Sequence, residues 1–445
     1  MKQIQRIFCL CLLLAGAFVS TQAQPLAAQP GESYPAFTDD GAWCWFSDPR
    51  AIFLHGKRKG LLSGWVKQDG TVETALMNPA TGAIITQALY PKLEVDDHNN
   101  PAFVELPDKQ PMVFYSKHSR TEFFYHRPAS PDSEQLFEEV QPFDLLSEAE
   151  LEKYPLRQIT YANPYVLKKE KNRLYCFGRW TGFKPNLIWS DDQGVSFTTA
   201  KVFISATPFD SRNRPYVKYF SDGKSRIHLV FTDGHPHVEP LNSVYYAYYE
   251  KGAFWRADGS KICTLDEIPF APADASLLYQ ATPETGRAWI YDIIADEKGR
   301  PVVAYARYPQ NTDHRYHYAR YDGQQWVDHE VCQAGKWFPQ TPEGTVEREL
   351  YYSAGMSLHP LQPQTLYLAR PVEGVFEVEK RTTTDGGKSW EISPITRGSQ
   401  YDQVRPYVPR NIKKGDPTVL LWMENERYVH YTDYRSRIRY RVEGK

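Results

Sequence analysis

The stretch Val95-Asp-Asp-His-Asn-Asn-Pro101 is the densest group of residues that can do acid–base chemistry, and His118 follows it in Tyr115-Ser-Lys-His118. Two strand-like segments joined by a turn at Pro107-Asp108 separate His98 from His118. If these segments form a hairpin, both imidazoles emerge at the same end of adjacent strands. Imidazole titrates near neutral pH, so the pair predicts general acid–base catalysis. Alternatively, His98 caps a turn and His118 is an ordinary surface histidine.

Two further segments place polar side chains where strand-like runs end. Tyr161 lies in Ile159-Thr-Tyr-Ala-Asn-Pro164, and Arg179 lies in Phe177-Gly-Arg-Trp180. A guanidinium binds carboxylates in a planar, bidentate manner, so Arg179 is a candidate for holding an acidic ligand. The alternative for both residues is aromatic core packing with a stacked surface arginine.

A third cluster combines Arg214-Pro-Tyr-Val-Lys-Tyr219 with Phe231-Thr-Asp-Gly-His-Pro236. Its histidine, His235, is either a donor that faces a ligand or a simple turn residue. The residues that we expect to bind substrate are Asn99, Asn100, Lys218 and His235.

The sequence contains no recognisable metal-binding pattern. Asp96, Asp97 and His235 are conceivable ligands, but their spacing matches no common zinc or calcium site. We therefore expect a protein that requires no cofactor, and we leave a structural calcium or zinc ion open.

The first 24 residues are typical of a secretory signal peptide. Lys2 and Arg6 precede an apolar run over 7–19, and small residues around Ala23 offer a cleavage site. The run is too short for a membrane anchor, so we predict a periplasmic or secreted protein.

That compartment permits disulfide bonds, and the four cysteines that follow the signal peptide could pair in three ways. The alternative is that they are buried thiols. The cysteines concerned are Cys44, Cys176, Cys263 and Cys332.

The composition favours many short strands and excludes some classes of partner. Aromatic residues make up 14% of the chain, with 30 Tyr and 11 Trp, and 33 Pro and 27 Gly supply turns. The net charge is −2, so no overall field would attract nucleic acid or an anionic membrane. An acidic ligand must therefore be met by local arginines, and we expect a monomer.

Repeated hairpins indicate the fold class. Ser190-Asp-Asp-Gln-Gly-Val-Ser-Phe197 and Thr383-Thr-Asp-Gly-Gly-Lys-Ser-Trp390 both match the Asp-box, a turn in which a carboxylate accepts backbone N–H bonds. No linker divides the chain, so we predict one all-β domain over residues 25–445. Its length corresponds to seven propeller blades of roughly 60 residues each, with six blades as the alternative.

The same segments resemble the BNR-repeat family, which includes propeller-type ulvan lyases, rhamnose-glucuronate lyases and rhamnosidases. The similarity covers the mature chain and includes Trp43-Cys-Trp-Phe-Ser-Asp-Pro-Arg-Ala51 and Asn242-Ser-Val-Tyr-Tyr-Ala-Tyr248, besides the two-histidine segment. It implies a lyase that cleaves an acidic polysaccharide by β-elimination beside a uronic acid. By position, the residues that it implies for catalysis are His98, His118, Tyr161 and Arg179.

The resemblance also implies roles for these residues. Arg179 would offset the uronate charge, His98 would remove the proton beside the carboxylate, and Tyr161 or His118 would protonate the leaving oxygen. Tyr165 is a near alternative to Tyr161. Two other functions stay open: a propeller-type glycoside hydrolase, rhamnosidase or sialidase-like, and a glycan-binding propeller without activity. The hydrolase would use Asp48, since some relatives have a histidine in that segment and this chain does not.

Overall fold

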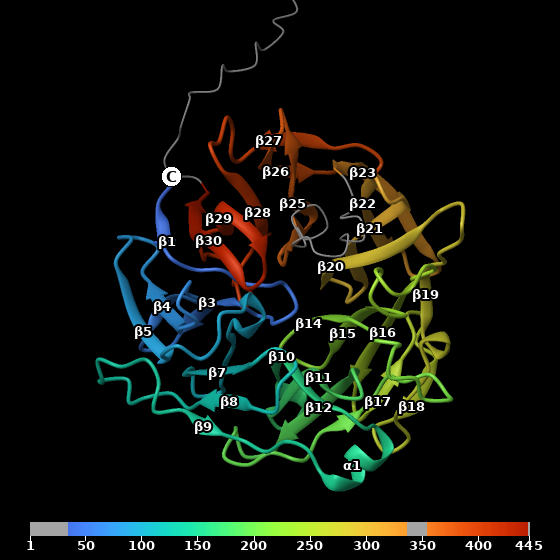
Figure 1. Cartoon of the computed structure of the whole chain (residues 1–445), viewed down its shortest axis with the longest axis horizontal. Coiled ribbons are helices and arrows are strands. Elements are labelled where there is room, and N and C mark those ends of the chain that lie inside the picture. Colours follow the sequence, from blue (N-terminus) through green and yellow to red (C-terminus); the bar gives the residue numbers. More distant parts are fainter. Residues whose placement is uncertain (1–33, 336–353, 444–445) are drawn as a thin grey trace, which may run out of the picture.

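The described strands form seven antiparallel sheets arranged in a ring around a central axis (Figure 1). The computed structural model describes residues 34–335 and 354–443, so the expected signal peptide lies outside the described residues. The chain is therefore a seven-bladed β-propeller, as predicted, and the six-bladed alternative is wrong. The first strands of most neighbouring blades contact one another around the axis.

Blades 1 to 3 each contain four strands, counted outwards from the axis. In order, the strands are β2 (Ala51–His55), β3 (Lys59–Val66), β4 (Val72–Met77) and β5 (Ile84–Tyr90); β6 (Ala102–Glu105), β7 (Pro111–Ser116), β8 (Phe123–His126) and β9 (Gln141–Pro142); and β10 (Arg157–Leu167), β11 (Arg173–Thr181), β12 (Lys184–Ser190) and β13 (Lys201–Val202).

Blades 4 to 7 complete the ring, and blade 4 has six strands. Their strands are β14 (Val217–Ser221), β15 (Ile227–Thr232), β16 (Val244–Glu250), β17 (Ala253–Trp255), β18 (Lys261–Thr264) and β19 (Ser276–Tyr279); β20 (Arg287–Ala295), β21 (Pro301–Gln310), β22 (Asp313–Tyr321) and β23 (Trp326–Gly335); β24 (Met356–His359), β25 (Gln362–Val372), β26 (Val375–Thr382) and β27 (Glu391–Pro394); and β28 (Asp402–Tyr407), β29 (Val419–His430), β30 (Asp433–Val442) and β1 (Ala36–Thr38).

The ring closes because β1, from the start of the described chain, pairs with β30 as the outer strand of blade 7. The described helices are short: α1 (Glu148–Lys153), η1 (Asp97–Asn99), η2 (Lys168–Glu170) and η3 (Pro272–Asp274). Within 34–335 and 354–443, none has the length and apolar character needed to span a bilayer.

The two Asp-boxes form the turns between β12 and β13 and between β26 and β27, as predicted. Asp385 accepts hydrogen bonds from the backbone N–H of Ser389 (2.9 Å) and from Thr383 Oγ1 (2.8 Å). Gly387 has a φ of +104°. Glycine adopts this conformation without strain, whereas residues with a side chain are strained in it. Trp390 then packs edge-on against Tyr318 in blade 5. The Asp-box is thus a structural feature that joins neighbouring blades.

Candidate active site

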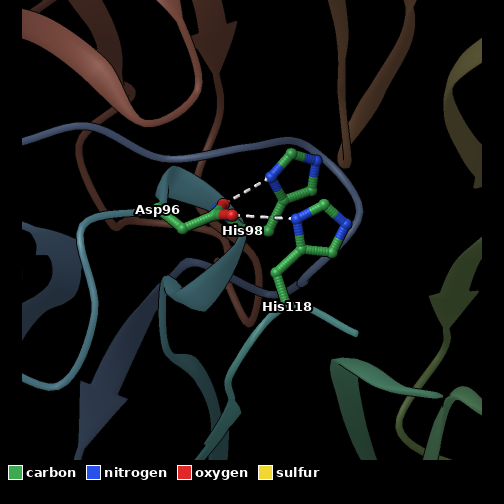
Figure 2. Close-up of side chains that lie close together, drawn as sticks. All are labelled: Asp96, His98 and His118. Carbon is green, nitrogen blue, oxygen red and sulfur yellow. Dashed lines mark hydrogen bonds and ion pairs between the residues drawn. The ribbon is translucent and has the colours of Figure 1, made fainter. Parts of the chain in front are cut away.

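The two histidines lie at the same end of the ring, as the hairpin predicts. His98 is in η1, just before β6, and His118 follows β7, which pairs with β6 in an antiparallel manner. The two imidazoles stack, with 4.0 Å between ring centroids and 18° between planes (Figure 2). Their side chains are 14% and 19% exposed, so they form part of an accessible surface. We call this end of the ring the histidine face.

One carboxylate binds both imidazoles. Asp96 Oδ1 accepts a hydrogen bond from His98 Nδ1 (2.7 Å), and Oδ2 accepts one from His118 Nδ1 (2.8 Å) (Figure 2). Since an ionised carboxylate can only accept, each Nδ1 carries a proton. This leaves Nε2 as the titrating nitrogen of each ring.

The electrostatics of this group distinguish the two rings. Burial alone would raise the pKa of Asp96, but the charge of His98 and hydrogen bonds from both imidazoles hold it well below its usual range. Burial, together with the positive charge of His98, lowers the pKa of His118 to about 4. His118 is therefore a neutral imidazole at neutral pH.

Contacts to other blades hold η1 in place. The buried carboxylate of Asp97 accepts hydrogen bonds from Arg405 Nη1 (2.5 Å) and from the Tyr428 hydroxyl (2.6 Å), both in blade 7. The Asn99 amide bonds Glu94, and the Asn100 amide bonds Cys44 N and Ser47 O. Both asparagine side chains are fully buried. The sequence predicts that Asn99 and Asn100 contact substrate, but in the structure both side chains hold neighbouring loops together through internal hydrogen bonds.

Tyr161 lies next to the histidines because of an irregularity in β10. The register of β10 against β11 shifts between Thr160 and Asn163, and Tyr161 has a φ of +70°. Its ring centroid lies 5.9 Å from that of His98. Burial, together with Tyr216, raises the pKa of Tyr161 well above its usual value, so the hydroxyl stays protonated. The alternative, Tyr165, instead donates to the carbonyl of Tyr219 and lines a cavity at the other end of the ring.

Arg179 is stacked between two tyrosines of the same site. Its guanidinium carbon lies 5.2 Å from the ring centroid of Tyr161 and 4.8 Å from that of Tyr216. Arg179 is 5% exposed, and its Nε and Nη1 have no hydrogen-bond partner in the described protein. Two buried guanidinium nitrogens without an acceptor are costly, so the position favours a bound anion.

A row of rings continues from Tyr161 along the histidine face. Tyr216 lies 6.2 Å from Tyr161, His235 lies 5.5 Å from Tyr216, and Trp289 lies 4.9 Å from His235, between centroids. Burial, followed by the charges of His237 and Arg179, lowers the pKa of His235 to about 3. A surface of aromatic rings with a few polar groups is typical of a site for a small organic ligand.

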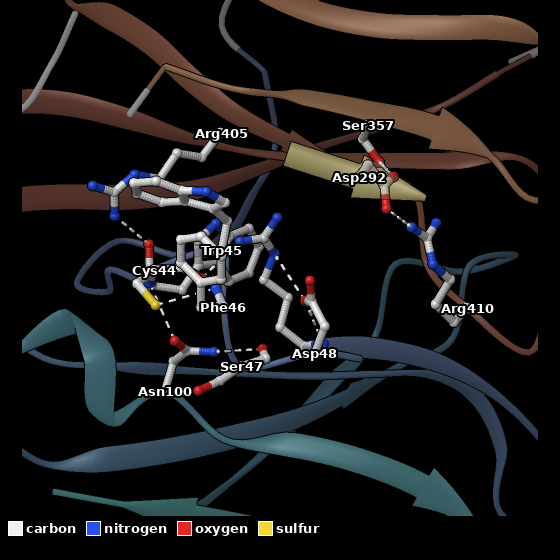
Figure 3. A network of polar contacts seen from close by, with 12 residues as sticks. Cys44, Trp45, Phe46, Ser47, Asp48, Asn100, Asp292, Ser357, Arg405 and Arg410 are labelled. Atoms are coloured by element: carbon white, nitrogen blue, oxygen red, sulfur yellow. Dashed lines mark hydrogen bonds and ion pairs between the residues drawn. The ribbon is translucent and has the colours of Figure 1, made fainter. Parts of the chain in front are cut away.

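The segment between β1 and β2 fills the centre of the ring beneath these rings (Figure 3). Phe46 lies 5.6 Å from Tyr161 and 5.2 Å from Trp289, while the guanidinium of Arg405 lies 5.1 Å from the ring of Trp45. This segment between β1 and β2, which we call the plug, therefore closes the central channel behind the histidine face with aromatic side chains.

Asp48 lies in this plug and meets Lys218 of β14, away from the histidines. The Lys218 ammonium donates to the Asp48 carboxylate and to the carbonyl of Trp45, and Lys218 is 2% exposed. This removes Lys218 from the expected substrate-binding residues, because the side chain is buried and two of its three donors already have acceptors. Asp48 is also within 3.6 Å of Arg50, so its carboxylate is engaged in ion pairs. This arrangement does not favour Asp48 as the acid of a hydrolase.

A cavity of about 1050 Å³ opens on the opposite face of the ring. The turns between first and second strands line it, and its residues include Glu105, Asp222, Glu297, His359 and Asp416. The plug separates this cavity from the stacked histidines.

Comparison with known proteins identifies the family. The model of the BNR repeat-containing family matches residues 63–334, which is more than half of the chain. The chain belongs to this family. In sequence it matches no curated protein.

Solved structures share the fold of this BNR-repeat protein. An ulvan lyase of family PL25, solved free and bound to a GlcA(1-4)Rha3S saccharide, has a TM-score of 0.68 at 14% identity, covering 91% of this chain and 94% of that chain. Polysaccharide lyase Uly1 has a TM-score of 0.55 at 13% identity, covering 95% and 94%. At these identities the similarity shows the shared propeller.

The Asp96, His98 and His118 group of this BNR-repeat protein offers three possible metal ligands within 4.8 Å of one another. The two imidazoles are nearly parallel, however, so their nitrogen lone pairs run side by side. Zinc requires lone pairs that converge on one point. The arrangement fits proton transfer better than metal binding.

The four cysteines, Cys44, Cys176, Cys263 and Cys332, are free thiols.

Sequence reasoning missed several residues of this site. Asp96 had been considered only as a metal ligand, although its position two residues before His98 is typical of a cap. Tyr431 lies 4.7 Å from His98 and 5.2 Å from His118 between centroids, yet it comes from blade 7. No local pattern in the sequence connects Tyr431 with the histidines. Tyr216 lies in the segment Arg214-Pro-Tyr-Val-Lys-Tyr219, but the sequence alone does not indicate a role for it.

Proposed function

We propose that this protein is a polysaccharide lyase that cleaves a glycosidic bond next to a uronic acid by β-elimination. The observation that carries the proposal is the stacked imidazole pair on Asp96 beside the buried Arg179, whose Nε and Nη1 have no hydrogen-bond partner among the described residues. In the reaction, a base removes the proton beside the uronate carboxylate. The released electron pair forms a carbon–carbon double bond, the adjacent carbon–oxygen bond breaks, and the leaving oxygen takes a proton.

The site contains a group for each step. His118 is the neutral imidazole at neutral pH, so we assign it the role of base in preference to His98. His98 or the protonated hydroxyl of Tyr161 then supplies the proton to the leaving oxygen. Arg179 provides the fixed positive charge that offsets the uronate carboxylate and makes the neighbouring proton more acidic.

The fold similarity supports this assignment without determining the substrate. The PL25 ulvan lyase, as its structure is described, binds a saccharide that contains GlcA. For this chain we propose an acidic oligo- or polysaccharide as substrate, action outside the cytoplasm after export, and a monomeric enzyme that needs no cofactor.

A panel of uronic-acid polysaccharides, followed by ultraviolet absorbance, tests the proposal. A lyase yields a conjugated double bond that absorbs, and we expect absorbance to rise with at least one uronate polymer. A hydrolase would release saturated reducing sugars without absorbance, and a binding module would retain an acidic oligosaccharide on a column while forming neither product. Either result would contradict the lyase assignment.

The rate of elimination should also depend on pH in a characteristic way. The base must be neutral, so activity is lost as pH falls through the pKa of His118, which is about 4 in the folded protein. An ordinary histidine would lose activity near its usual pKa of about 6.5. We therefore expect the acid limb of kcat/KM to lie clearly below pH 6.5, measured with a substrate whose uronate stays ionised. An acid limb at the ordinary value would assign the base to another group.

A further inference from the structure

A second arginine, Arg214, lies beside Arg179. Arg214, just before β14, places its guanidinium carbon 3.8 Å from the ring centroid of Phe183, and that of Arg179 lies 5.5 Å from the same ring. Neither guanidinium forms an ion pair within the described residues, and Arg214 Nε is buried without a hydrogen-bond partner. Burial, followed by the charge of Arg179, lowers the pKa of Arg214.

Arg179 is buried and Arg214 is half-buried, and the other buried arginines differ from both. Each of them pairs with a carboxylate: Arg50 with Asp48, Arg381 with Glu379, Arg405 with Asp97 and Arg410 with Asp292. Placing two positive charges side by side without an anion is unfavourable in a partly buried site. The protein tolerates this cost at Arg179 and Arg214, which indicates that a ligand brings the negative charge.

The acidic residues near Arg214 are engaged elsewhere. Asp210 is held by Arg212 through a hydrogen bond from the backbone N–H (2.8 Å) and an ion pair (3.2 Å). Glu239 accepts from the Asn213 amide (3.3 Å), and Asp233 accepts from the backbone N–H of Ser243 (2.8 Å). The same loop receives a further cation, because the Lys184 ammonium donates to the carbonyls of Asp210 and Asn213. The surroundings of Arg214 therefore leave its charge free for an incoming anion.

We propose that Arg214 forms a second anion subsite, adjacent to Arg179, which binds a second oxyanion of the same saccharide. The preferred substrate then carries a sulfate ester or a carboxylate on a sugar next to the uronate that is cleaved. This inference rests on the proposed function and specifies the substrate of the same site. A guanidinium suits both groups, since it donates two parallel hydrogen bonds to paired oxygens.

The test compares Arg214→Gln with Arg212→Gln on three oligosaccharides, in which the neighbouring sugar is sulfated, is itself a uronate, or is neutral. Arg212 is a matched control, because it lies on the same loop, is 85% exposed and pairs with Asp210. For Arg214→Gln we expect KM to rise at least about tenfold on an oligosaccharide with a second anion, the factor for one charge-assisted hydrogen bond. The kcat and the KM for the neutral oligosaccharide should stay near wild type, as should all values for Arg212→Gln.

The pattern of the effect identifies the anion. A rise in KM confined to the sulfated oligosaccharide assigns a sulfate subsite, one confined to the uronate oligosaccharide assigns a carboxylate subsite, and a rise with both assigns a general oxyanion subsite. Arg214→Lys, which keeps the charge, should lie between wild type and Arg214→Gln. Unchanged KM values for Arg214→Gln on all three oligosaccharides would overturn the subsite.

Failure of the proposed function can be distinguished from failure of the subsite. If wild type forms no unsaturated product from any of the three oligosaccharides, the lyase assignment fails. Titration calorimetry with the same oligosaccharides then tests the subsite alone. Weaker binding of the doubly charged oligosaccharides by Arg214→Gln than by wild type supports it, and equal binding rejects it.

Discussion

Replacement of His118 by alanine is expected to lower the rate of unsaturated product formation by about 10²–10⁴-fold, the usual contribution of a general base. His118 is the imidazole on Asp96 whose pKa is lowered, so its replacement removes the neutral base. The loss should appear in kcat, since Arg179 and the row of aromatic rings still bind the substrate. Ultraviolet absorbance measured at saturating substrate reports it directly.

His55→Ala is the matched control for His118→Ala. His55 also pairs with a carboxylate, Asp416 (2.8 Å), but at the end of β2 on the opposite face of the ring. We expect His55→Ala to keep the wild-type rate, and both variants to unfold close to the wild-type temperature, because neither imidazole belongs to a hydrophobic core. A wild-type rate in His118→Ala would show that the base is another residue.

The propeller could be predicted from sequence because its signals are local. An Asp-box needs only its own hairpin: Asp385 binds Ser389 four residues on, and Gly387 adopts its conformation within the same turn. The stacking of His98 and His118 depends on one hairpin, β6 and β7, so the spacing was sufficient to place them together. Both features are decided within a few tens of residues.

Other parts of the site depend on where distant segments meet. Tyr161 could not be separated from Tyr165 by strand alternation, since the irregularity after Thr160 changes which side chains face the histidines. The sequence predicts that Lys218 binds substrate, but the plug brings Asp48 to it from a distant part of the chain. Tyr431 reaches His98 only because the ring closes between blades 7 and 1.

Asn99 and Asn100 show why a polar residue type does not reveal the direction of its side chain. Both follow His98 directly in sequence, yet both point into the protein and bond the backbone or side chains of neighbouring loops. A short 3₁₀ helix next to a central plug leaves many backbone groups that need partners, and asparagine supplies both a donor and an acceptor. The side chains of Asn99 and Asn100 therefore form internal hydrogen bonds and are not directed at a ligand.

Asp96→Asn should reduce kcat about a hundredfold or more while leaving KM near the wild-type value. The carboxylate accepts one hydrogen bond from each imidazole, whereas an amide has a single acceptor oxygen and therefore releases one ring. The released ring can then rotate or place its proton on Nε2, the atom that must accept the substrate proton. Loss of the tautomer that a carboxylate enforces is a known route to large losses in acid–base catalysis.

A readout other than rate separates this positioning role from a general structural one. Nitrogen NMR of the imidazoles should show His118 with its proton on Nδ1 in wild type and a substantial Nε2–H population in Asp96→Asn. Asp108→Asn is the control, since Asp108 lies in the β6–β7 turn of the same blade and, within the part of the chain that the structure describes, accepts only from the backbone N–H of Gln110 (3.0 Å). If Asp96→Asn kept both the wild-type kcat and the Nδ1–H form of His118, the shared carboxylate would not be what orients the base.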